Sequence, residues 1–265
     1  MRPATVLLAA VALAAGCGGG GESERDAVKR YISEANRAQA QFRPGVQAAQ
    51  SAIRSFADGR SGPQVAERLG RASATMRSAR AALARVDPPP GARSLHGHQL
   101  ELLDLQAQLA LELSLAASYL PGAVAVIRPA DDAGTSLARA LRSAADGAAQ
   151  ATALEDYVAD LDWTLGRLAA LGAPPVLEPW HAAQVARLRA SRDLAAGLAG
   201  GIRDQDRGAI DRALRSFSSQ SPARGPAQRA QREAIAVFNE RLEQQEELVT
   251  AIYREQAELA EKFGS

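Results

Sequence analysis

Apolar residues recur three and four positions apart along most of the chain, which is the spacing of one face of an α-helix. One such stripe, near the start of the folded part, consists of Val28, Tyr31, Ile32, Ala35, Ala38 and Phe42. A second stripe has the spacing of coiled coils and consists of Ile235, Phe238, Leu242, Val249, Ile252, Leu259 and Phe263. No alternating apolar and polar run of useful length is present, so the pattern predicts helices throughout.

Proline and glycine divide this pattern into separate helices. Pro44-Gly45, Pro121-Gly122 and Gly200-Gly201 are expected to interrupt long helices, because proline lacks an amide donor and glycine is flexible. Asp58-Gly59 and Asp146-Gly147 place glycine where helices commonly stop. The predicted helices are 24–43, 46–57, 63–86, 94–120, 134–146, 148–171, 178–199, 205–217 and 226–262.

The chain contains an internal repeat. Residues 82–103 align without gaps with residues 167–188, and His96 matches His181. Upstream of each lies a second matching string, at 53–59 and 141–147. A weaker copy of that string at 214–220 is read as the trace of a third unit. The predicted helical segments are therefore 26–93, 94–177 and 178–265, which we expect to form one continuous domain, 26–265.

Long helices joined by tight corners are expected to pack antiparallel, so the predicted fold is all-α, a helical bundle or a short helical solenoid built from the duplicated unit. Helix 94–120 is predicted to lie at its centre. Most of its surface is Leu and Ala, and its polar residues share one narrow face. These polar residues are Glu101, Asp104, Gln108 and Glu112. Their charges argue against a membrane span.

Composition agrees with a helical, folded protein. The hydrophobic share is 46%, mostly Ala and Leu, and aromatic residues make up only 4%. Without Arg2, which lies in the part expected to be removed, basic and acidic residues balance at 30 each (31 Lys and Arg minus one, against 30 Asp and Glu). A neutral chain without a basic run lacks the electrostatic pattern of a nucleic-acid binder, so nucleic acid is not an expected partner.

The first residues have the layout of an export signal. Arg2 and the α-amino group make a basic start, and an apolar stretch follows from Ala4 to Ala15. These residues would form a helix of about 18 Å, which is too short for a hydrocarbon core of roughly 30 Å. Residues 1–16 are therefore predicted to be a signal peptide and not a membrane span.

The end of this signal, Leu13-Ala14-Ala15-Gly16-Cys17, resembles the lipobox of bacterial lipoprotein precursors, with Ala14 in place of the commoner Leu. The resemblance implies diacylglycerol on the sulfur of Cys17 and cleavage after Gly16. Cys17 is the only cysteine, which excludes a disulfide framework and any metal cluster built on cysteine. The alternative is an ordinary signal peptide with a chance cysteine. Residues 17–25 read as the lipidated cysteine and a short Gly-rich tether.

These features predict a protein held by lipid on the extracytoplasmic face of the cell membrane. If the source has an outer membrane, that membrane is an alternative location, since Gly18 and not Asp follows the cysteine. The expected partners are the membrane itself and an unknown protein or polymer of the cell envelope.

The histidines allow two interpretations. His96 and His181 stand at equivalent places just after a proline corner, and the functional interpretation is a metal site that they form with Glu101, Asp104 or Glu178. The alternative is structural, with each imidazole donating to backbone carbonyls at the end of the preceding helix or packing on the prolines. Repetition at equivalent sites favours the structural role, so no metal and no cofactor is predicted.

Two tryptophans, Trp163 and Trp180, allow a similar choice. With Tyr157 they would line an apolar pocket between helices, or they would anchor a core otherwise built from small side chains. We favour the core. Two acidic clusters, Glu155-Asp156-Asp160-Asp162 and Glu243-Glu246-Glu247, read as solvated helix faces.

No catalytic motif is recognisable, so no catalytic residue is assigned and the chain is not expected to be an enzyme. The folded part also resembles helical lipoproteins of high-GC Gram-positive bacteria, in the Tyr31-Ile32 and Asn36 start and in the Pro-Pro corners before His96 and His181. That resemblance implies no activity. The sequence favours a non-enzymatic envelope protein that binds a partner or acts as a spacer. The alternative is a small-ligand or metal-binding lipoprotein with a pocket between helical units, around Trp163, Trp180 and the two histidines.

Overall fold

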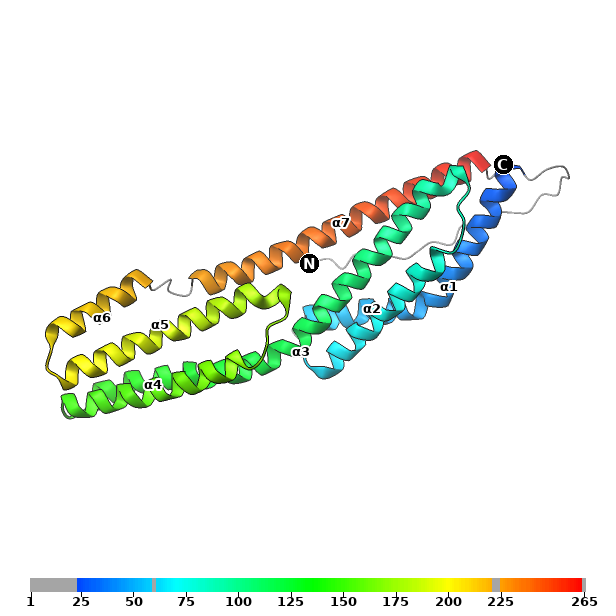
Figure 1. Ribbon diagram of the computed structural model, residues 1–265. Coiled ribbons are helices and arrows are strands. Elements are labelled where there is room, and N and C mark those ends of the chain that lie inside the picture. The colour runs from blue at the N-terminus through cyan, green and yellow to red at the C-terminus, as the bar shows by residue number, and fades with distance from the viewer. Residues whose placement is uncertain (1–22, 59–60, 221–224, 264–265) are drawn as a thin grey trace. The chain divides into compact units, whose positions relative to one another are not determined.

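The computed structural model describes residues 23–58, 61–220 and 225–263. Within them every regular element is a helix, which confirms the predicted all-α class (Figure 1). The α-helices are α1 (Glu24–Ala57), α2 (Pro63–Leu83), α3 (Arg93–Ser143), α4 (Gly147–Ala169), α5 (Glu178–Arg203), α6 (Arg207–Gln220) and α7 (Gly225–Phe263). Short 3₁₀ helices η1 (Pro90–Ala92) and η2 (Pro175–Leu177) form the two proline corners.

The helices form two compact units. Unit 1 contains α1, α2, α3 up to Ala117, and α7 from Val237 onward. Unit 2 runs from Ser118 to Ala236 and contains the rest of α3, then α4, α5, α6 and the start of α7. The borders between the two units therefore lie inside the helices α3 and α7.

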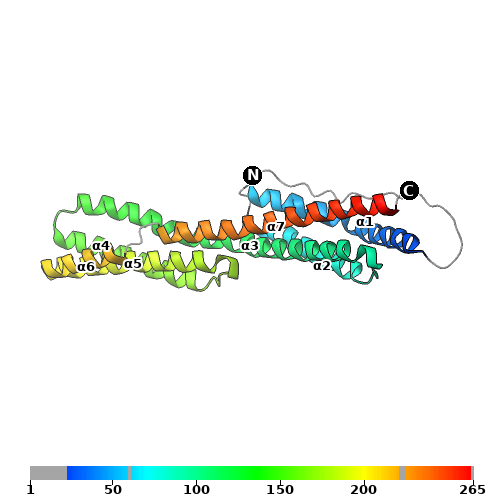
Figure 2. The ribbon, with the colours of Figure 1, turned by 90° about the horizontal axis from the view of Figure 1, so that it is seen from above.

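Neighbouring helices pack side by side within each unit. In unit 1, α1 lies against α2, and in unit 2, α5 lies against both α4 and α6 (Figures 1 and 2). Leucines supply the most deeply buried large side chains: Leu69, Leu83 and Leu109 in unit 1, and Leu161, Leu168 and Leu188 in unit 2. Each unit thus has its own apolar core.

The helix breaks expected at Pro44, Pro121 and Gly200-Gly201 are wrong, because α1, α3 and α5 run through these positions. Proline in a helix deprives the carbonyl four residues earlier of its donor. For Pro121 that carbonyl belongs to Ala117, which accepts a hydrogen bond from the backbone N–H of Gly62 at 3.0 Å. A neighbouring segment thus replaces the missing donor, and the helix continues.

The first half of α3 is central to unit 1, as its sequence predicts. Glu101, Asp104 and Gln108 are exposed along one stripe, and the other faces are largely buried. The hydroxyls of Ser73 and Ser114 donate to backbone carbonyls across the α2–α3 contact, each at 2.7 Å.

One stretch of the described chain, Pro90–Ser143, is long and apolar enough to cross a membrane by length and composition alone, and an 18-residue window within it has a mean hydropathy of 1.6. The core helix of a soluble protein passes the same test. This observation is therefore weak evidence for a span.

Candidate functional site

The proline corners of the two repeat copies each hold a tyrosine–histidine pair. The hydroxyl of Tyr31 on α1 lies 3.2 Å from Nδ1 of His96, which is 65 residues further along the chain. The hydroxyl of Tyr119 on α3 lies 2.6 Å from Nδ1 of His181, 62 residues further. The tyrosine–histidine spacing is thus three residues shorter in the second copy. The spacing between the two matching strings of the repeat is also three residues shorter in that copy. The two pairs are therefore the same feature, duplicated.

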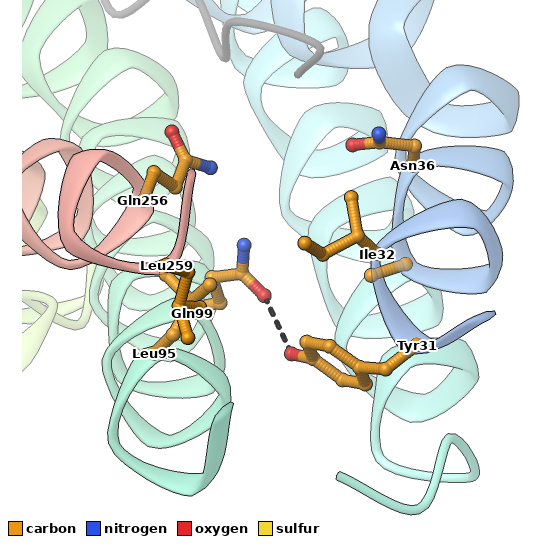
Figure 3. A pocket seen from close by; sticks show the side chains of 8 residues that line it. Tyr31, Ile32, Asn36, Leu95, Gln99, Gln256 and Leu259 are labelled. Carbon is orange, nitrogen blue, oxygen red and sulfur yellow. Dashed lines mark hydrogen bonds between the residues drawn. The ribbon is translucent and has the colours of Figure 1, made fainter. Parts of the chain in front are cut away.

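In unit 1 the pair belongs to a buried chain of polar groups. Tyr31, His96 and Gln99 have exposed fractions of 2%, 8% and 4%. The hydroxyl of Tyr31 donates to Oε1 of Gln99 at 3.2 Å, across the space between α1 and α3 (Figure 3). A hydroxyl has one hydrogen to give, so Nδ1 of His96 is the protonated ring nitrogen and donates to Tyr31. The direction of hydrogen bonding is thus His96 to Tyr31 to Gln99.

Burial sets the protonation states of this pair. It raises the pKa of Tyr31 far above its ordinary value of 10.0, so the phenol stays neutral. It also lowers the pKa of His96 below 6.5, and the opposing effect of the Asp87 charge is smaller. Both rings are therefore neutral at neutral pH.

A small cavity adjoins Tyr31 and Gln99. Its volume is about 10 Å³, which is close to the minimum that holds one water molecule. The lining residues come from α1, α3 and α7 and are Tyr31, Ile32, Ala35, Asn36, Leu95, Gln99, Gln256 and Leu259 (Figure 3). This cavity is too small for an organic ligand in the described conformation.

In unit 2 the pair has a different neighbour. Trp180 occupies the repeat position of Leu95 and packs edge-on against the ring of Tyr119, with ring centroids 6.3 Å apart. His181 also meets Tyr119 edge-on. Burial raises the pKa of Tyr119, as it does for Tyr31. The larger indole thus fills part of the corner of the second copy.

The hydrogen-bond partners of His96 and His181 are not the backbone carbonyls that we expected. The structural interpretation placed backbone carbonyls or prolines next to the imidazoles of His96 and His181, and tyrosine hydroxyls are the partners found. In the described part of the chain, no group of three or more His, Cys, Asp and Glu side chains could hold a metal ion. Asp104, one of the acids considered for such a site, pairs instead with Arg80 at 2.8 Å.

Trp163 is not a core residue, which corrects the favoured interpretation. It lies on α4 with 56% of its surface exposed, and the guanidinium carbon of Arg167 lies 5.5 Å from its ring centre. Trp180, in contrast, packs against the core of unit 2. The periodicity of α4 places position 163 on the outer side of the helix. The prediction was wrong because it relied on the size of the indole.

A third histidine contact, that of His98, was not predicted from the sequence. Glu255 on α7 is bound through one oxygen by the hydroxyl of Ser94 at 2.5 Å and approached through the other by Nδ1 of His98 at 3.3 Å. These contacts join α3 to α7 in unit 1. No signal in the sequence points to them, because the partners are more than 150 positions apart. The tyrosine–histidine pairs, however, could have been found, since Tyr31 and Tyr119 share the offset of the repeat.

We expect the His96 environment to make stability depend on pH. The folded state holds the pKa of His96 below the unfolded value of 6.5, so at intermediate pH the unfolded chain binds more protons. The free energy of unfolding should therefore fall as the pH drops through 6.5, until the lowered pKa is passed. Urea denaturation followed by circular dichroism, from about pH 7.5 to about pH 4.5, measures this loss.

His96→Asn is the matched variant, because its amide donor replaces Nδ1–H toward Tyr31. This variant lacks the titrating group, so the part of the pH dependence of the free energy of unfolding that His96 causes should disappear. His98 and His181 remain in both proteins, so the difference between the two profiles reports His96 alone. Identical slopes in both proteins would contradict the assignment.

Comparisons with known proteins add no relative to this picture. No protein-family model matches the chain. No match is found among curated proteins or among solved structures. Cys17 and Gly16, the predicted lipidation and cleavage residues, lie outside the described residues.

Proposed function

We propose that the mature chain, beginning at Cys17, is a lipid-anchored helical protein on the extracytoplasmic face of a bacterial membrane. It works without catalysis, by binding a protein or polymer of the cell envelope or as a spacer. The observation that carries this proposal is the lipobox-like string Leu13–Cys17, placed directly after a basic start and a short apolar stretch and holding the only cysteine of the chain.

The use of the polar side chains supports a structural role for the repeat corners. The tyrosine–histidine pair joins helices within each copy, and in unit 1 it is almost completely buried. Both tyrosines are held neutral by burial. Because these tyrosine and histidine side chains bond to each other between helices, they stabilise helix packing and are not positioned to meet a substrate.

The exposed indole of Trp163 supports binding to another macromolecule. Trp and Arg are the residue types most enriched at the energetic centres of protein interfaces, and Trp163 stands under Arg167 on the surface of α4. A large aromatic ring that is 56% exposed contributes little to the core of unit 2.

Replacing Cys17 with serine tests the anchor. The wild-type protein should fractionate with membranes and carry the added mass of its acyl chains, and Cys17→Ser should lose that mass and leave the membrane fraction. Serine cannot form the thioether to diacylglycerol, and two or more acyl chains are needed for firm attachment. Cell fractionation with intact-mass spectrometry measures both effects. A membrane-bound variant with an unchanged mass increment would refute the proposal.

A further inference from the structure

Three segments of unit 1 meet at one of its ends. They are the first turn of α1, the corner at residues 88–92 that contains η1, and the last turn of α7; α1 and η1 are in contact. A Cβ atom placed on Gly91 would lie 3.0 Å from Oε1 of Glu24 and 3.8 Å from ring carbons of Phe263. We call this the Glu24 end of unit 1.

The opposite end of unit 1 is well separated from it. There the backbone N–H of Gly62, just before α2, bonds to the carbonyl of Ala117. From Arg93 to Ala117, α3 advances by about 36 Å, at 1.5 Å per residue. Labels placed at these two ends therefore report two clearly different positions.

The chain before Glu24 limits how far this end can lie from the lipid. Seven residue steps separate Cys17 from Glu24, and a fully extended chain of that length spans at most about 25 Å. This limit is shorter than the distance between the two ends of unit 1. An acyl group on Cys17 would therefore keep the Glu24 end close to the bilayer.

The sides of unit 1 do not offer lipid a continuous apolar face on which the unit could lie flat. An interfacial helix needs a continuous apolar face, but the exposed sides of α2 and α3 carry charged pairs, Arg71 with Glu67 and Arg80 with Asp104. Pressing these groups into lipid would remove their hydration. A bilayer without net charge does not attract the basic residues of α1 and α2, so on such a bilayer the position of the tether sets the orientation.

We propose that the Glu24 end of unit 1 faces the bilayer, with the start of α2 directed away from it. This inference rests on the proposed lipid anchor at Cys17. In this orientation the Tyr31–His96 pair, which lies near the Glu24 end, is close to the membrane.

Energy transfer to lipid tests the orientation. Arg93→Cys and Gln64→Cys each place one thiol at an exposed helix start, at the Glu24 end and at the opposite end. Cys17 of the lipidated protein is blocked by its thioether, so a donor dye marks only the new cysteine. The labelled proteins are bound to phosphatidylcholine vesicles that carry an acceptor on the headgroup. We expect a larger loss of donor fluorescence at position 93 than at position 64.

Equal losses, or a larger loss at position 64, would overturn the orientation while leaving the anchor in place. If neither protein floats with the vesicles and neither carries acyl mass, the proposed anchor itself is wrong, and the orientation with it. The same labels on a Cys17→Ser background should show no transfer, and circular dichroism confirms that the exposed substitutions leave the fold intact.

Discussion

Leu69→Ala is expected to lower the free energy of unfolding by about 2–5 kcal/mol, the usual range for a leucine removed from a packed core. Leu69 on α2 is 0% exposed. It packs in a cluster with Ala52, Val65, Ala66, Leu109, Leu113 and Ala117. Four of these six neighbours are alanine or valine, whose short side chains cannot move far into the space left by the leucine. Urea denaturation followed by circular dichroism measures the loss.

Leu115→Ala is the matched control in the same unit. Leu115 is 43% exposed on α3, so its truncation removes little buried surface, and alanine is the better helix former. We expect a change within about 0.5 kcal/mol. A loss at Leu115 as large as that at Leu69 would mean that the assignment of inner and outer faces in unit 1 is wrong.

The sequence predicts the helices well because their pattern is local. Apolar spacing of three and four residues, together with the Pro-Pro corners, places α2, α4, α5 and α7 close to their observed bounds. The interruption at Pro121 was wrong for a reason outside the local pattern. The donor that replaces the missing N–H comes from Gly62, a residue of another segment, and such a contact is not readable from spacing.

The candidate site was predictable only in part. The repeat identified His96 and His181 as equivalent, but the partners were expected in the backbone, while the structure supplies Tyr31 and Tyr119. Tyr31 and Tyr119 are 88 positions apart, which is also the offset between the strings at 53–59 and 141–147, so a search of the repeat for matching polar residues would have found them. The exposure of Trp163 was not predictable from residue type, because burial depends on which face of α4 meets its neighbours.

The close approach of α5 and α6 supports the last prediction, which compares two adjacent glycines. A Cβ atom on Gly201 would lie 2.7 Å from Cγ1 of Ile210 and 3.1 Å from the backbone nitrogen of the same residue. At Gly200 nothing lies within 4 Å of such an atom. Gly201 therefore lets the two helices approach, whereas Gly200 faces open space.

Gly200→Ala and Gly201→Ala both gain the helix preference of alanine, roughly 0.5–1 kcal/mol, so that gain cancels in the comparison. The clash with Ile210 remains only for Gly201→Ala, because a backbone atom cannot turn away as a side chain can. We expect Gly201→Ala to be less stable than Gly200→Ala by about 1–3 kcal/mol, the usual cost of overpacking. Thermal and urea denaturation of the two variants measure the difference. Equal stabilities would show that α6 does not pack against α5 at this distance in solution.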